Sequence, residues 1–247
     1  MILPDQKDAI HKAWLYRVLI NFCDSPLLSS SLYFKGGTCA AMRGLLDRFS
    51  VDLDFDYVAE DDRLSDVRLE MERIFDELGM EIKDRSKMVP QYFLRYKNNR
   101  ENERNSLKID VTLPPPRSNR YEPVRLVDID RILYCQTADT MFSNKMVALV
   151  ERHEKNGSIA GRDLYDLHHF FITGQDYNRD VILERRNIER VGDYLRLLLE
   201  FITNHFTERI ISQDLNMLLP YKKFRSIRKT LINETIFLLR DEIKRIS

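Results

Sequence analysis

The sequence predicts an α+β protein, in which a mixed β-sheet with flanking helices is followed by a C-terminal helical bundle. Helix-like and strand-like patterns alternate up to about residue 113, as expected for a sheet with helices packed against it. From Thr137 onward, almost every segment has the apolar spacing of a helix. We therefore predict an α/β domain over residues 1–130 and a helical bundle domain over residues 131–247.

The predicted elements of the first half follow from apolar periodicity. In chain order they are a helix at 5–23, a loop at 29–31, a strand-like segment at 32–34, about three turns of helix after residue 38, a strand at 51–56, a helix at 61–79, and strands at 80–83, 89–97 and 106–113. Residues 98–105 form a polar connector between the last two strands. Pro114 ends the last strand, because proline cannot donate to a sheet ladder.

The strand signal then weakens and helices follow. The predicted elements are short strands at 124–127 and 132–134, then helices at 138–155, 162–173, 180–206, 208–217 and 221–244, of which the third and the last are either single or broken. The many leucines of residues 195–199 are typical of a packed bundle.

Composition limits the class of protein. Lys+Arg and Asp+Glu both total 39 in 247 residues, so a formal net charge of zero gives no support for a nucleic-acid partner beyond a local basic patch. With 32% charged and 43% apolar residues, the chain reads as globular. The 3 scattered cysteines suggest reduced thiols of a cytoplasmic protein. No apolar run reaches the roughly 18 residues of a membrane span.

The most informative stretch begins with a Lys35-Gly36-Gly37-Thr38 turn and ends with alternating apolar and acidic residues at 51–56. Glycines let a backbone approach a phosphate closely. The alternation puts Asp52, Asp54 and Asp56 on one strand face, where a cation such as Mg²⁺ would relieve their mutual repulsion. Together these features indicate metal-assisted phosphoryl or nucleotidyl transfer.

Other acids have two interpretations each. Asp110 lies on the polar face of its strand, either as a third carboxylate of the site or as a solvated acid. Asp56, at a strand end, is more simply a solvated or pairing residue. In the helical half, Lys145 and Arg152 share one helix face, and Asp163 and Asp166 share another. They form either a salt-bridged helix hairpin or part of a site.

A basic run at residues 222–229 interleaves Lys and Arg with apolar residues. Such a run is either the solvated face of a helix or an RNA-contact patch.

The segments 34–38 and 48–55, Phe-Lys-Gly-Gly-Thr and Arg-Phe-Ser-Val-Asp-Leu-Asp-Phe, closely resemble the signature of the AbiEii/AbiGii-type nucleotidyltransferases. These are toxin components of type IV toxin–antitoxin and abortive-infection systems, within the polymerase-beta-like nucleotidyltransferase superfamily. The resemblance extends to Asp110, to Lys145 and to the Arg-Asp-x-x-Asp block that begins at Arg162. Residues 175–247 match the family only in being helical.

The resemblance implies a role for each matching residue. Binding of the triphosphate is implied for Lys35, Gly36, Gly37 and Thr38, and binding of Mg²⁺ for Asp52 and Asp54. Arg48 and Ser50 would brace the turn or the phosphates, Asp110 would be the third acid, and Lys145 would contact a phosphate. Asp163 would be an essential acid near the site, supported by Arg162 and Asp166.

The function expected from the residues and the resemblance together is transfer of an NMP from an NTP to a hydroxyl acceptor, with one or two Mg²⁺ ions and release of pyrophosphate. The family implies a toxin that acts on the 3′ end of tRNA, and a cognate antitoxin as partner. Two alternatives stay open: a transferase that modifies a small molecule or a protein side chain, and a non-catalytic NTP-binding module. The sequence leaves open which NTP is used and the oligomeric state.

Overall fold

The structure is a computed structural model that describes residues 1–98 and 103–246. Contacts divide the chain into two compact units: unit 1 is Met1–Pro115 with Tyr121–Gln136, and unit 2 is Pro116–Arg120 with Thr137–Ser247. Half of the polar connector predicted at 98–105, residues 99–102, lies outside the described residues.

Unit 1 is built on a mixed sheet that, among the described residues, has seven strands in the order β3-β4-β5-β2-β1-β7-β6. The strands are β1 (Leu32–Lys35), β2 (Asp52–Tyr57), β3 (Glu81–Arg85), β4 (Tyr92–Arg95), β5 (Ser106–Thr112), β6 (Tyr121–Leu126) and β7 (Arg131–Gln136). The pairs β2–β5 and β1–β7 are parallel, and the other neighbours are antiparallel. Every strand predicted from the sequence is confirmed, with shifts of a few residues at the ends.

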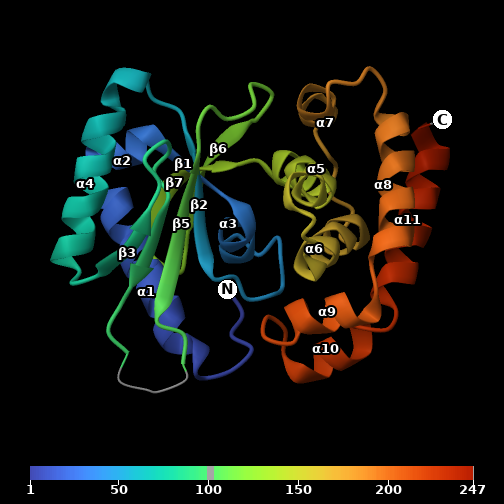
Figure 1. Cartoon of the computed structure of the whole chain (residues 1–247), viewed down its shortest axis with the longest axis horizontal. Helices are drawn as coiled ribbons and strands as arrows, with labels where there is room; N and C mark the ends of the chain where they lie inside the picture. The colour runs from blue at the N-terminus through green and yellow to red at the C-terminus, as the bar shows by residue number, and fades with distance from the viewer. Residues whose placement is uncertain (99–102, 247) are drawn as a thin grey trace. The chain divides into compact units, whose positions relative to one another are not determined.

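The two faces of the sheet differ in chemistry, as the alternation in the sequence predicts. Phe34, Leu53 and Ile109 are fully buried or nearly so on one face. Figure 1 shows α1 (Asp8–Asp24), α2 (Pro26–Ser31) and α4 (Leu64–Glu77) on one side of the sheet and α3 (Gly36–Met42) on the other. A short 3₁₀ turn, η1 (Asp61–Arg63), precedes α4.

The loop predicted at residues 29–31 is wrong, because these residues end helix α2. Pro26 stands at the first helical position, where its missing N–H costs nothing, and the Ser25 side chain accepts a hydrogen bond from the Leu28 N–H. The sequence analysis takes Ser25-Pro26 as the end of the first helix, whereas in the structure this pair begins helix α2. Helix α3 is also shorter than predicted, with 7 residues, and it ends just before Gly44, whose φ is +75°.

Unit 2 is helical. Its helices are α5 (Ala138–Asn156), α6 (Gly161–Ile172), α7 (Arg179–Arg186), α8 (Val191–His205), α9 (Glu208–Leu215), α10 (Tyr221–Ile227) and α11 (Leu231–Ile246). The long helix predicted at 180–206 is broken at Asn187, which has a φ of +50° and caps α7 in the left-handed conformation. Leucines 164, 195, 198 and 239 are fully buried in the bundle core.

The contact division follows residue 136, whereas the sequence places the domain boundary after residue 130. Strand β7 pairs with both β1 and β6, so residues 131–136 group with the sheet. Residues 116–120 group with the helices, because the backbone N–H groups of Arg117 and Ser118 both donate to the Glu184 carboxylate at 2.8 Å. Within residues 1–98 and 103–246, no helix combines the length and the apolar character that crossing a membrane requires.

Candidate active site

Helix α3 follows β1 directly, without the turn predicted at residues 35–38, and its first residue, Gly36, has its backbone against the carboxylate of Asp54. Gly36 has a φ of +77°, and a Cβ at this position would lie 2.2 Å from Asp54 Oδ2. Lys35 is paired in register with Asp54 across the antiparallel β1–β2 ladder. Two independent constraints, the backbone conformation and the close approach, therefore require glycine at position 36.

Gly37 is held close to Arg48 and Ser50. A Cβ on Gly37 would lie 2.8 Å from Arg48 Nη2 and 2.8 Å from Ser50 Oγ. Arg48 is almost completely buried, and its Nη1 donates to the Phe49 carbonyl oxygen at 2.8 Å. These contacts bring together Gly37, Arg48 and Ser50, as the family resemblance implies. Their contact with a nucleotide stays a prediction.

Thr38 connects α3 to β2. Its side chain is fully buried, and its hydroxyl donates to the Asp52 carbonyl oxygen. This bond holds the first turn of α3 at the start of the strand that carries the predicted metal ligands. The geometry gives Thr38 a positioning role, and triphosphate binding by Thr38 stays a prediction.

The predicted acids lie on adjacent strands. In the parallel β2–β5 ladder, Asp54 is opposite Asp110 and Asp52 is opposite Lys108. Directly opposed residues of a ladder project from the same face, so Asp52, Asp54 and Asp110 share the polar face of the sheet. Asp52 and Asp54 are half-buried. The structure thus places Asp110 beside Asp54, as the site interpretation of Asp110 requires.

The sequence analysis missed Lys108. Its Nζ lies 2.5 Å from Asp110 Oδ2, and it projects from the same face as the acids. An ammonium group among three carboxylates offsets part of their mutual repulsion. Lys108 precedes Asp110 by two residues on a strand of alternating pattern, and this spacing is the sequence signal that could have placed it on the same face as the acids.

Asp56 is fully buried and forms an ion pair. Lys35 Nζ lies 2.6 Å from Asp56 Oδ1 and 2.5 Å from Thr112 Oγ1. The other carboxylate oxygen accepts from Gln136 Nε2 at 2.6 Å and from the Tyr121 hydroxyl at 2.8 Å. The pairing interpretation of Asp56 is confirmed, and a solvated Asp56 is wrong. Lys35 is thereby held at the end of β1, and its contact with a nucleotide stays a prediction.

His11 supports the segment that leads into β2, and it too was missed. Its ring is buried, its Nε2 donates to the Val51 carbonyl oxygen at 2.9 Å, and its Nδ1 lies 2.9 Å from the Tyr96 hydroxyl. Burial lowers the pKa of His11 to about 4, so the ring is neutral near pH 7.

The donor set on the polar face fits Mg²⁺, which prefers hard carboxylate oxygens. Asp52 and Asp54 supply such oxygens, and Asp110 adds another on the neighbouring strand. Because Gly36 has no Cβ, its backbone lies directly against that carboxylate. Within the described ranges, no three His, Cys, Asp or Glu side chains are grouped as ready metal ligands.

In unit 2, Lys145 of α5 is the centre of an ion-pair cluster with α6. Its Nζ lies 3.0 Å from Asp163 Oδ1 and 2.9 Å from Asp166 Oδ2. Both carboxylates are almost completely buried. The salt-bridged hairpin predicted from the sequence is therefore present. Ion pairing and a role in the reaction are compatible, so the site interpretation of this block stays a prediction.

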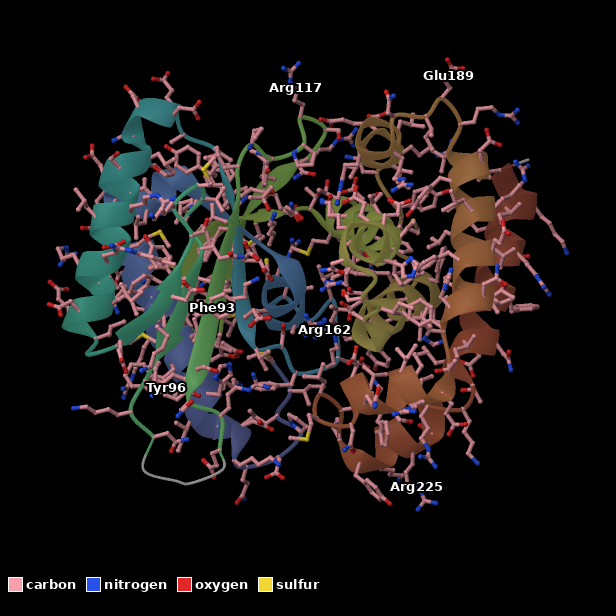
Figure 2. All side chains as sticks on the ribbon, viewed as in Figure 1. Phe93, Tyr96, Arg117, Arg162, Glu189 and Arg225 are labelled. Carbon is pink, nitrogen blue, oxygen red and sulfur yellow. The ribbon has the colours of Figure 1, made fainter. Side chains whose placement is uncertain are left out.

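Asp163 is paired with a second cation in this cluster. Arg152 Nη2 lies 3.0 Å from its Oδ2. Burial by itself would raise the pKa of Asp163, but the positive charges of Lys145, Arg152 and Arg162 outweigh it and hold the pKa well below its usual range. Arg162 lies half-buried in the first turn of α6 (Figure 2).

The model of a family described as "Nucleotidyl transferase AbiEii toxin, Type IV TA system" matches residues 18–234. A search of curated proteins gives no match.

Two crystal structures from Helicobacter pylori have a similar fold. A candidate nucleotidyltransferase is 18% identical with a TM-score of 0.60, covering 98% of this chain and 97% of that chain. The protein JHP933 is 18% identical with a TM-score of 0.58, covering 99% of this chain and 95% of that chain. At this identity the likeness shows the fold alone. The family match spans most of both units, and the chain therefore belongs to the AbiEii nucleotidyl transferase toxin family of type IV toxin–antitoxin systems and is a nucleotidyltransferase.

Proposed function

We propose that this chain moves an NMP from an NTP to a hydroxyl group of an RNA acceptor, with Mg²⁺ held by Asp52 and Asp54. The observation that carries the proposal is the juxtaposition of three features on one sheet face. The Gly36 backbone touches the Asp54 carboxylate, and Asp110 stands directly beside Asp54 on the parallel neighbour strand. A glycine backbone at a helix N-terminus, next to paired carboxylates, suits a nucleotide triphosphate with its metal ion.

Each residue of unit 1 has a distinct part in the proposed reaction. The Gly36 backbone contacts phosphate oxygens in this proposal, and Arg48 and Ser50 brace the adjacent Gly37. Bound Mg²⁺ would offset the negative charge of the triphosphate. Asp110 accepts the proton of the acceptor hydroxyl. The hydroxyl oxygen then forms a bond to the α-phosphorus, the bond between that phosphorus and its bridging oxygen breaks, and pyrophosphate leaves.

For the residues of unit 2, the family resemblance assigns a phosphate contact to Lys145 and a supporting role to Arg162, and both roles stay predictions. Asp163 is only 1% exposed and lies 3.0 Å from both Lys145 Nζ and Arg152 Nη2. We therefore assign Asp163 a positioning role, in which it fixes those cations and does not itself react.

The acceptor in this proposal is the 3′ end of a tRNA, and the reaction takes place in the cytoplasm. Membership in a toxin–antitoxin family supports a macromolecular target and implies an antitoxin partner. The three cysteines that the structure describes, Cys23, Cys39 and Cys135, are free thiols, which suits a reducing compartment.

The test is a labelling experiment with a matched control variant. The full chain is incubated with Mg²⁺, each α-labelled NTP, and total cellular RNA or total protein. We expect label in the tRNA fraction, at its 3′ end. Asp54→Asn should lower transfer by about 100-fold or more, as loss of a charge-stabilising group does. Asp84→Asn, which alters an exposed acid on β3 of the same sheet, should leave it unchanged.

Label in protein or in small molecules would contradict the RNA acceptor. Absence of transfer to any pool would contradict the reaction itself.

A further inference from the structure

A basic segment follows α9 in unit 2. It comprises Lys222, Lys223, Arg225, Arg228 and Lys229, on α10 and the turn after it. Between Asp214 and Glu234 the chain has these five basic residues and no acid, although its formal net charge is +0. Positive charge is therefore concentrated at one place in a neutral protein.

The inner side of the basic segment is anchored on the bundle. Phe224 is 7% exposed, and the Arg228 guanidinium lies 5.8 Å from the centre of its ring. Lys223 Nζ lies 5.7 Å from the centre of the Tyr165 ring on α6. Tyr165 stands between Asp163 and Asp166, so the basic segment contacts the helix that carries the Arg-Asp-x-x-Asp block.

The outer side presents an aromatic ring among cations. Tyr221 is 70% exposed, and the Arg225 guanidinium lies 5.8 Å from the centre of its ring. Lys222, Arg225 and Lys229 are exposed, and Figure 2 shows Arg225 projecting outward from α10. In the part of the chain that the structure describes, these three have no ion pair with a carboxylate; within the segment, Arg228 lies 3.8 Å from Glu208.

We propose that the basic segment binds the phosphodiester backbone of the RNA acceptor, and that Tyr221 stacks on an unpaired base of that RNA. The proposal deepens the function above and rests on it. Clustered cations with few neighbouring acids repel each other, and a bound polyanion relieves this repulsion. Binding also releases the counterions of the polyanion, which favours the complex. An exposed aromatic ring beside an arginine suits single-stranded bases, which stack on such surfaces without regard to sequence.

The experiment measures binding without catalysis. Fluorescence anisotropy follows end-labelled, deacylated bulk tRNA binding to the full chain carrying Asp54→Asn. One triple variant adds Lys222→Gln, Arg225→Gln and Lys229→Gln. The matched control adds Arg196→Gln, Arg240→Gln and Lys244→Gln, which remove the same charge from exposed positions on α8 and α11 of the same unit. Thermal melting checks that both variants stay folded.

We expect the basic-segment triple to weaken tRNA binding by about 10-fold or more at moderate salt and to lower the slope of log K against log salt by roughly 2. The control triple should change binding by less than threefold. Tyr221→Leu should weaken binding to a single-stranded oligonucleotide by roughly 10-fold while leaving the salt slope unchanged. In otherwise wild-type enzyme, the basic-segment triple should raise the KM for tRNA and leave the affinity for NTP unchanged.

Equal losses of tRNA affinity in the basic-segment triple variant and in the control triple variant would overturn the proposal, because the net charge of the protein would then explain binding. Unchanged tRNA binding in the basic-segment triple would also overturn it, as would loss of antitoxin binding in that triple with tRNA binding intact. If wild-type enzyme labels tRNA but the triple behaves as wild type, this inference fails and the proposed function stands. If tRNA is bound through the basic segment but never labelled, the proposed function fails and this inference stands.

Discussion

Gly36→Ala is the sharpest test of the candidate site, because two separate costs can be worked out for it. The first is backbone strain, since Gly36 has a φ of +77° and a non-glycine residue there loses about 1–2 kcal/mol. The second is steric. The new Cβ would lie 2.2 Å from Asp54 Oδ2 and 2.9 Å from Asp54 Cβ. Restoring van der Waals distance moves the carboxylate by roughly 1 Å, and a misplacement of that size in an active site lowers the rate by about 100-fold.

Gly44→Ala is the matched control. Gly44 has a φ of +75°, and a Cβ there would have nothing within 4 Å. It therefore carries the same backbone strain without displacing Asp54. Urea unfolding should show a loss of about 1–2 kcal/mol in Gly44→Ala and at least as much in Gly36→Ala.

The rate of transfer from a labelled NTP separates the two variants. It should fall by about 100-fold in Gly36→Ala and stay near wild type in Gly44→Ala, at a temperature where both are folded. Rates within threefold of each other would refute the assignment of Gly36 and Asp54 to one site.

Two further predictions concern stability. As pH falls from 6.5 to 4, His11 becomes protonated in the unfolded chain but stays largely neutral in the folded chain, because burial lowers its pKa to about 4. The free energy of unfolding, measured with urea, should therefore fall by about 2–3 kcal/mol over this range. His11→Gln should not show this loss. Lys145→Met should lower the free energy of unfolding by about 3 kcal/mol, because it leaves Asp163 and Asp166 buried with one cation fewer. A loss below about 1 kcal/mol would show that Lys145 is dispensable for the fold.

The elements themselves could be read largely from the sequence. The alternation at residues 51–56 and 106–113 is a local signal of period two, and it correctly predicts β2, β5 and the polar face they share. The sequence analysis missed helix α2, because a Ser-Pro pair such as Ser25-Pro26 is common both at the start of a helix and in a turn. Only the hydrogen bond from the Leu28 N–H distinguishes the two.

The contacts of the charged residues required the tertiary structure. The sequence identifies Asp54 and Asp110 as candidates, but strand order and register decide that they are neighbours. Lys35 could equally face a phosphate or a carboxylate, and its pairing with Asp56 depends on Gln136 and Tyr121 from strands far along the chain.

Local periodicity is encoded within a few residues and is visible in one sequence, and it determined the fold class and the polar sheet face. Ion pairs and close approaches depend on which segments the folded chain brings together. The tertiary structure alone decided that the Gly36 backbone lies against Asp54, that Asp56 is buried with Lys35, and that Lys145 holds two buried acids.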